Sequence, residues 1–212
     1  MNPLIKIVTA ICLFVCFAAQ VIHLKPEFER ARLKAMNEIS PDAFDEIVSL
    51  SLGKSSLNRE RLDAYLRYAQ QLTQMDPKRA DAWGLSGFCL FHQGEKEKSL
   101  QAYQKASELM PAFYGFHYNL AFINFKMQNY QQAAEEIQKT LLCDPRDSML
   151  YILSASKIYA LMLVAKMNHG IPAEDQLKNG YQKSYQLLAA VQYRIKMGAA
   201  FPGEDQFTLE GF

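Results

Sequence analysis

The histidines and cysteines are the residues of this chain whose types could bind a metal ion or act in catalysis. No two histidines have the i, i+4 spacing that places side chains on one helix face, and none has a cysteine pair nearby, as a zinc or haem site requires. The sequence also lacks a glycine-rich phosphate loop and a nucleophile elbow. We therefore expect no metal, no cofactor, no small-molecule substrate and no enzymatic activity. The four histidines are His23, His92, His117 and His169.

The four cysteines fall into two groups. Cys12 and Cys16 share one helix face at i, i+4, but two thiols alone make an incomplete metal site. Cys89 and Cys143 lie on apolar faces of predicted helices, where a cysteine behaves as a small buried hydrophobic residue. This spacing gives no disulfide framework, so the redox compartment stays open.

An uncharged apolar stretch occupies residues 7–24, between Lys6 and Lys25. As a helix it would be roughly 27 Å long, enough to span the hydrocarbon core of a bilayer. A cleaved signal peptide would carry more positive charge before the stretch and small residues at its cleavage site. We therefore predict an uncleaved N-terminal transmembrane anchor over residues 1–25, followed by a connecting segment at residues 26–41.

Two cues disagree on which side of the membrane the rest of the chain lies. Basic residues are more numerous after the span than before it, which by positive-inside counting favours the cytoplasm. Bacterial chains with a short N-terminus and one span before helical repeats are often exported. We expect a bacterial inner membrane with the repeats on the periplasmic side, and the cytoplasmic side is the alternative.

Three prolines, Pro77, Pro111 and Pro145, recur at a period of 34 residues and divide the chain into repeating units. Two clear units occupy residues 80–113 and 114–147. Small residues recur where two antiparallel helices must cross closely, and a large residue follows them on the same face. The matching positions are Trp83, Gly87, Gly94, Ser99, Tyr103 and Ala106 in the first unit, and His117, Ala121, Gln128, Ala133, Ile137 and Thr140 in the second.

These two units resemble the tetratricopeptide repeat (TPR) family, and His117 and Gln128 are the noticeable departures from its pattern. The resemblance implies an all-α fold: a short TPR-type solenoid of about four antiparallel helix pairs over residues 42–198. Divergent pairs would occupy residues 42–79 and 148–197. Within them we predict helices at Asp42 to Gly53, Asn58 to Asp76, Ser148 to Asn168, and about Ala173 to Lys196.

In the resembled fold, the first helix of each unit lines a concave groove that binds proteins. The lining implied here is largely aromatic, which suits the apolar face of a helix or an extended peptide and suits a small anion poorly. These rings could instead pack against neighbouring helices, or the chain's own C-terminal segment could fill the groove. The implied residues are Phe88, Phe91, His92, Tyr118, Phe122, Phe125, Lys126, Ile152 and Tyr159.

The C-terminal tail, residues 199–212, combines phenylalanines with acidic and turn residues. It could be a disordered peptide or a strand that docks on a surface, and the sequence does not decide between them.

The near balance of 23 basic and 22 acidic residues gives no field to hold nucleic acid. We therefore expect protein partners, such as a helix or peptide of a membrane-associated complex, and lipid contact through residues 7–24. The favoured function is a membrane-anchored TPR scaffold for protein–protein interaction, acting as an adaptor or assembly factor. The alternative is a permanent structural accessory subunit of a membrane or envelope complex.

Overall fold

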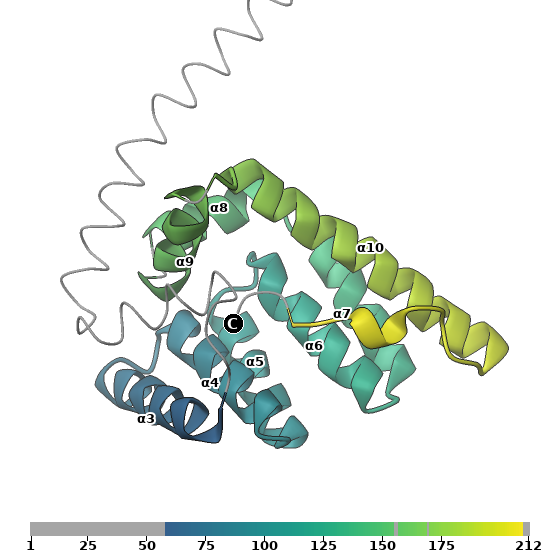
Figure 1. Cartoon of the computed structure of the whole chain (residues 1–212), viewed down its shortest axis with the longest axis horizontal. Helices are drawn as coiled ribbons and strands as arrows, with labels where there is room; N and C mark the ends of the chain where they lie inside the picture. Colours follow the sequence, from purple (N-terminus) through teal and green to yellow (C-terminus); the bar gives the residue numbers. More distant parts are fainter. Residues whose placement is uncertain (1–57, 155–156, 169, 210–212) are drawn as a thin grey trace, which may run out of the picture.

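The computed structural model of the protein describes residues 58–154, 157–168 and 170–209 (Figure 1). These residues form helices without any strand, which fits the predicted all-α, TPR-like solenoid. The predicted anchor, the connecting segment and the helix at Asp42 to Gly53 lie outside the described residues. The helices are α3 (Arg59–Met75), α4 (Ala80–His92), α5 (Lys96–Leu109), α6 (Tyr114–Lys126), α7 (Tyr130–Leu142), α8 (Pro145–Ser154), α9 (Lys157–Asn168), α10 (Ala173–Met197) and the short 3-10 helix η1 (Glu204–Gln206).

Within this described part, no helix combines the length and the apolarity needed to cross a membrane.

Helices α3 to α7 pack side by side in chain order, and α4/α5 and α6/α7 are the two clear repeat units. The crossing of α4 and α5 requires a small residue at Gly87, because a Cβ atom there would lie 2.7 Å from the ring of Tyr103. Ser99 donates a hydrogen bond of 2.6 Å to the carbonyl oxygen of Gly87 across the same crossing. The predicted reason for small residues at these positions is confirmed in this unit.

The two residues at the aromatic position of the repeat make the same contact with the loop before them. Trp83 Nε1 donates to the carbonyl oxygen of Pro77 at 3.0 Å, and His117 Nε2 lies 3.1 Å from the carbonyl oxygen of Pro111. His117 also places Nδ1 2.9 Å from a carboxylate oxygen of Glu136 on α7. Histidine departs from the family pattern and is smaller than tryptophan. Its two ring nitrogens nevertheless link the loop before α6 with Glu136 on α7.

The turns inside the two units share a left-handed residue. Gly94 has φ +86°, and Gln128, 34 residues later, has φ +64°. Glycine tolerates this conformation freely, whereas a residue with a side chain does not. The departure of Gln128 from the repeat pattern therefore leaves a locally unfavourable backbone at the second turn.

After α7 the chain leaves the regular stack. The stretch predicted as a single helix from Ser148 to Asn168 is described as two helices, α8 and α9, on either side of residues 155–156. Ser148 Oγ donates to the carbonyl oxygen of Ala112 at 3.0 Å, which fixes the start of α8 to the loop before α6. The backbone N–H of Ile158 donates to Asp81 at 3.4 Å, which fixes the start of α9 to the start of α4.

Asp81 is suited to this role because it is held as a buried, paired carboxylate. It is 1% exposed and forms two hydrogen bonds with the guanidinium of Arg79, at 3.0 and 2.8 Å. A buried carboxylate without such a partner would be strongly unfavourable. Helices α8 and α9 consequently pack against α4 and the start of α6, the first helices of the two units.

Helix α10 packs mainly along α7 and only sparsely against α9. Helix α10 lies beside α7 (Figure 1), and α9 contacts both α4 and α10, while the divergent pair expected over residues 148–197 stays a prediction. Gly180 permits the close approach of α10, since a Cβ atom there would lie 2.2 Å from the hydroxyl oxygen of Tyr114. Gly198, at φ +63°, ends the helix and lets the chain turn back.

Candidate functional site

The residues implied for the groove gather in two neighbouring apolar clusters. Phe88, Ile152 and Tyr159 belong to one, together with residues of α3 to α6. Tyr118, Phe122 and Phe125 belong to the other, which we call the α6 cluster. Phe91 is half-buried and packs against both clusters, and its ring centroid lies 5.5 Å from that of Phe122.

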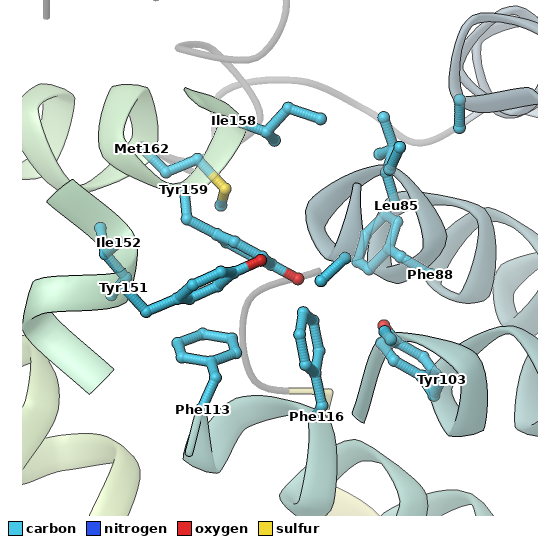
Figure 2. Close-up of a cluster of buried hydrophobic side chains, with 14 of the residues drawn as sticks. Leu85, Phe88, Tyr103, Phe113, Phe116, Tyr151, Ile152, Ile158, Tyr159 and Met162 are labelled. Carbon is cyan, nitrogen blue, oxygen red and sulfur yellow. The ribbon is translucent and has the colours of Figure 1, made fainter. Parts of the chain in front are cut away.

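The first cluster is closed by α8 and α9. Figure 2 shows the rings of Tyr151 and Tyr159 reaching from these helices towards Phe113, just before α6, and Phe116, on α6. The centroid of Phe113 lies 5.4 Å from that of Tyr151 and 5.0 Å from that of Tyr159. Phe88, on α4, is also buried. These rings pack against neighbouring helices, which was one of the alternatives that the sequence left open.

The α6 cluster is covered by α10. Tyr118, Phe122 and Phe125 are 0%, 2% and 5% exposed, and they share the cluster with Leu187 and Val191 of α10. Side chains spaced by three and four residues lie on one helix face, so α10 presents one continuous buried stripe to the helices beneath it. The stripe consists of Ala173, Leu177, Gly180, Ser184, Leu187 and Val191, which are all buried.

The tail, described from residue 199 to 209, completes the cover of the α6 cluster. Phe201, Phe207 and Leu209 are half-buried and pack against the cluster, and the ring of Phe207 lies 6.3 Å from that of Phe125. The hydroxyl of Tyr118 donates to the carbonyl oxygen of Thr208 at 3.2 Å. Figure 1 shows the tail running back from the end of α10 towards α6 and α7. The chain's own C-terminal segment therefore occupies part of the groove, which was the second alternative left open by the sequence.

An ion pair fastens the beginning of the tail to α10. Arg194 pairs with Glu204 through both carboxylate oxygens, with an Nε–Oε2 distance of 2.9 Å, and the backbone N–H of Phe201 donates to the same carboxylate at 2.9 Å. The hydrogen bond from Arg194 lowers the pKa of Glu204, against the smaller opposing effect of desolvation. The carboxylate is consequently charged at neutral pH and holds the turn at η1.

Two implied residues lie at the accessible edge of the groove. His92 is exposed and packs against Phe88 in a tilted arrangement, with ring centroids 4.4 Å apart. Lys126 is half-buried, and its ammonium lies 5.4 Å from the ring centroid of Phe122. Lys126 therefore covers part of an aromatic ring, and the charged end of the groove remains in contact with solvent.

The two described cysteines have the environment of structural residues. Burial raises the pKa of Cys89 to about 12 and that of Cys143 to about 11. Both thiols are protonated at neutral pH, which makes them poor nucleophiles. Among the described residues no group of three or more His, Cys, Asp or Glu side chains is placed to hold a metal ion.

The fold defines a TPR-like helical module whose aromatic groove is covered by its own α10 and tail. No family model matches the chain. It is similar to peroxisomal targeting signal receptors, with 27% identity over 106 residues in Candida glabrata, 29% over 107 in Eremothecium gossypii and 27% over 107 in Kluyveromyces lactis. Each match covers 50% of this chain but only 17% or 18% of the relative, so the chain spans a small part of those proteins.

Proposed function

We propose that this chain is a TPR-type adaptor that binds a helical or extended segment of a partner protein on the aromatic α6 cluster, where its own tail lies in the unbound state. The supporting observation is the tail itself, a short segment with three apolar side chains seated on that cluster. It acts as an internal example of the kind of ligand that this surface accepts. The similarity to targeting-signal receptors also supports a role in protein–protein interaction.

The tail is the part of the cover that a partner can replace. Helix α10 buries a continuous stripe along α7, whereas Phe201, Phe207 and Leu209 are only half-buried. Displacing the tail would therefore expose less apolar surface than displacing α10 would. The proposed binding surface is therefore the tail-covered part of the groove and its edge at Phe91, His92 and Lys126.

A peptide binding in trans tests this proposal directly. A chain ending at Gly198 should bind a fluorescent peptide of residues 199–209 with saturation, and the full chain should bind it much more weakly because its own tail competes. The control peptide carries serine in place of Phe201 and Phe207. Failure of the truncated chain to bind, or equal binding of both peptides, would overturn the proposal, provided that circular dichroism shows the truncated chain still folded.

A milder variant separates the groove contact from general packing. Tyr118→Phe removes the hydrogen bond to the carbonyl oxygen of Thr208 and keeps the buried ring. One neutral hydrogen bond contributes about 1 kcal/mol, so the peptide should bind about fivefold more weakly. Glutamate at Phe122 or Phe125 is a poor test, because both side chains are nearly fully buried and a charge there would disturb the fold.

We further propose that residues 7–24 anchor this adaptor in a bacterial inner membrane, with the repeats on the periplasmic side. The uncharged length of this stretch supports the anchor. Alkaline phosphatase fused at the C-terminus folds in the periplasm and should be active. Activity confined to a fluorescent protein that matures only in the cytoplasm would reverse the proposed orientation.

The covered groove also favours the second candidate, a permanent accessory subunit that uses its other faces. Purification in detergent with mass spectrometry separates the two functions. An adaptor should lose its partner on washing and on addition of the 199–209 peptide. A permanent subunit should keep its partner in a fixed ratio under both treatments.

A further inference from the structure

The end of the tail lies on the groove as a short extended segment. Phe207 has φ −66° and ψ 137°, which belong to the extended region of the backbone. Phe207 and Leu209 are half-buried against the apolar clusters, whereas Thr208 between them is exposed. Side chains of an extended chain point alternately to opposite sides, so this segment presents every second residue to the groove.

The two half-buried positions have different surroundings. The ring of Phe207 lies 6.3 Å from that of Phe125 in an edge-to-face arrangement, with 68° between the ring planes. Such an aromatic pair contributes beyond the area that it buries, and an aliphatic side chain cannot reproduce it. Leu209 packs against both apolar clusters, as Phe91 does, so its site lies where the clusters meet. The first site therefore favours an aromatic ring, and the second accepts an aliphatic side chain of the size of leucine.

The backbone between these two side chains is also recognised. The hydroxyl of Tyr118 donates to the carbonyl oxygen of Thr208 at 3.2 Å. Every residue has a carbonyl group, so this contact fixes the register of an extended segment without selecting the middle side chain. Because the side chain of Thr208 is exposed, the middle position tolerates other residues.

The beginning of the tail is held by contacts of a different kind. Arg194 on α10 pairs with Glu204, whose carboxylate also accepts the backbone N–H of Phe201. The rings of Phe201 and Tyr193 meet edge to face, with centroids 5.7 Å apart. These contacts join the turn at η1 to α10 and do not involve the side chains of residues 207–209. The last residues can therefore leave the groove while the turn stays in place.

We propose that the partner segment is extended, has the pattern aromatic–x–aliphatic, and replaces only residues 207–209. Its aromatic ring takes the place of Phe207, the carbonyl of its middle residue accepts the hydrogen bond from Tyr118, and its aliphatic side chain takes the place of Leu209. The turn at η1 remains on α10 in the complex. A helical segment does not fit this register, because side chains two positions apart do not share a helix face. This inference rests on the proposed function and specifies the chemistry of its partner.

The full chain carrying Phe207→Ser and Leu209→Ser, which we call the open chain, tests this pattern. It removes the two apolar side chains of the segment and keeps the pair between Arg194 and Glu204. A fluorescent peptide of residues 205–209, blocked at both ends, should bind the open chain with saturation in an anisotropy titration. It should bind the unchanged chain much more weakly, because the native tail competes for the same sites.

Two matched peptides examine the pattern itself. A peptide in which Phe207 and Leu209 exchange places should bind the open chain about fivefold more weakly, since it loses the aromatic pair with Phe125. The exchanged peptide has the same composition, so uptake by the apolar residues 7–24 cannot separate the two. A peptide with Thr208→Gln should bind within about twofold of the original, because the middle side chain points away from the groove.

The possible failures are distinguishable. Equal binding of the original and exchanged peptides, or a loss with Thr208→Gln as large as that with the exchange, would overturn the pattern and leave the adaptor proposal standing. Binding of a peptide of residues 199–209 without binding of residues 205–209 would show that the tail acts as one unit, which contradicts the partial replacement. Failure of both peptides to bind the open chain would instead overturn the proposed function on which the pattern rests.

Discussion

Substituting Gln128 by glycine should stabilise the protein, because Gln128 holds a left-handed backbone conformation at φ +64°. A residue with a Cβ atom pays roughly 1–2 kcal/mol for this conformation. Glycine relieves that cost but brings a more flexible unfolded chain, which offsets roughly 0.5–1 kcal/mol. The side chain of Gln128 is exposed, so its loss removes little packing. The net expectation is a gain of about 0.5–1 kcal/mol in the free energy of unfolding.

The first repeat unit supplies the reciprocal experiment. Gly94 occupies the equivalent turn at φ +86°, and a Cβ atom added there would meet no heavy atom within 4 Å. Gly94→Gln should therefore lose about what Gln128→Gly gains, through backbone conformation alone. Urea unfolding followed by circular dichroism measures both differences. A loss of stability in Gln128→Gly, or no change in Gly94→Gln, would refute the assignment of strain to this turn.

Three further substitutions test the helix contacts and the tail. Gly180→Ala should destabilise the protein by roughly 1–3 kcal/mol in thermal unfolding, because its methyl group would meet the hydroxyl of Tyr114. Burial acts to raise the pKa of Glu136, but hydrogen bonds from a neighbouring histidine and lysine outweigh it and lower the pKa. The carboxylate therefore stabilises the fold at pH values above its ordinary pKa of 4.5, and this stabilisation is lost as the pH falls through the lower pKa of the folded state. Glu136→Gln should therefore make the free energy of unfolding depend less steeply on pH in the acid range. Glu204→Gln should loosen the tail at neutral pH, because it removes the ion pair with Arg194, and faster proteolysis after Gly198 would report the change.

The repeat could be predicted from the sequence because its contacts are local and recur at a fixed spacing. Gly87 is small because the ring of Tyr103, sixteen positions later in the same unit, lies against it. Pro77 and Pro111 each offer a carbonyl oxygen to the residue six positions on. Such relations are visible in an alignment of the chain with itself, because they join residues that are close in the sequence.

The positions of α8 and α9 depend on contacts between distant parts of the chain, which periodicity does not contain. The backbone N–H of Ile158 reaches Asp81 across 77 residues, and Ser148 reaches Ala112 across 36. An apolar helix of this composition could as readily have continued the stack. The backbone of α9 is joined to α4 by a buried carboxylate, and an acidic residue in a first helical turn looks like an ordinary capping residue in the sequence.

The aromatic groove is a second feature that residue types alone could not fully predict, and it is the one that bears on function. Phe122 and Phe125 have the residue type and spacing expected for a partner's apolar face, and that surface accepts the chain's own Leu187 and Phe207 equally well. Apolar burial is not directional, so the residue types define an apolar surface without identifying what covers it. The residue types thus leave open what covers this surface, and the structure shows that α10 and the tail cover the α6 cluster.

The attachment of the tail to α10 sets a requirement for any partner. A segment joined by a short flexible connection acts at an effective concentration on the order of millimolar. A separate segment with the same contacts and a micromolar concentration in the cell would therefore lose to the tail by about a thousandfold. A natural partner must add contacts that the tail does not make, and the exposed edge at His92 and Lys126 is where such contacts are available. Additional contacts at that edge would let a matching segment displace the tail, whereas the tail would still exclude segments that lack them.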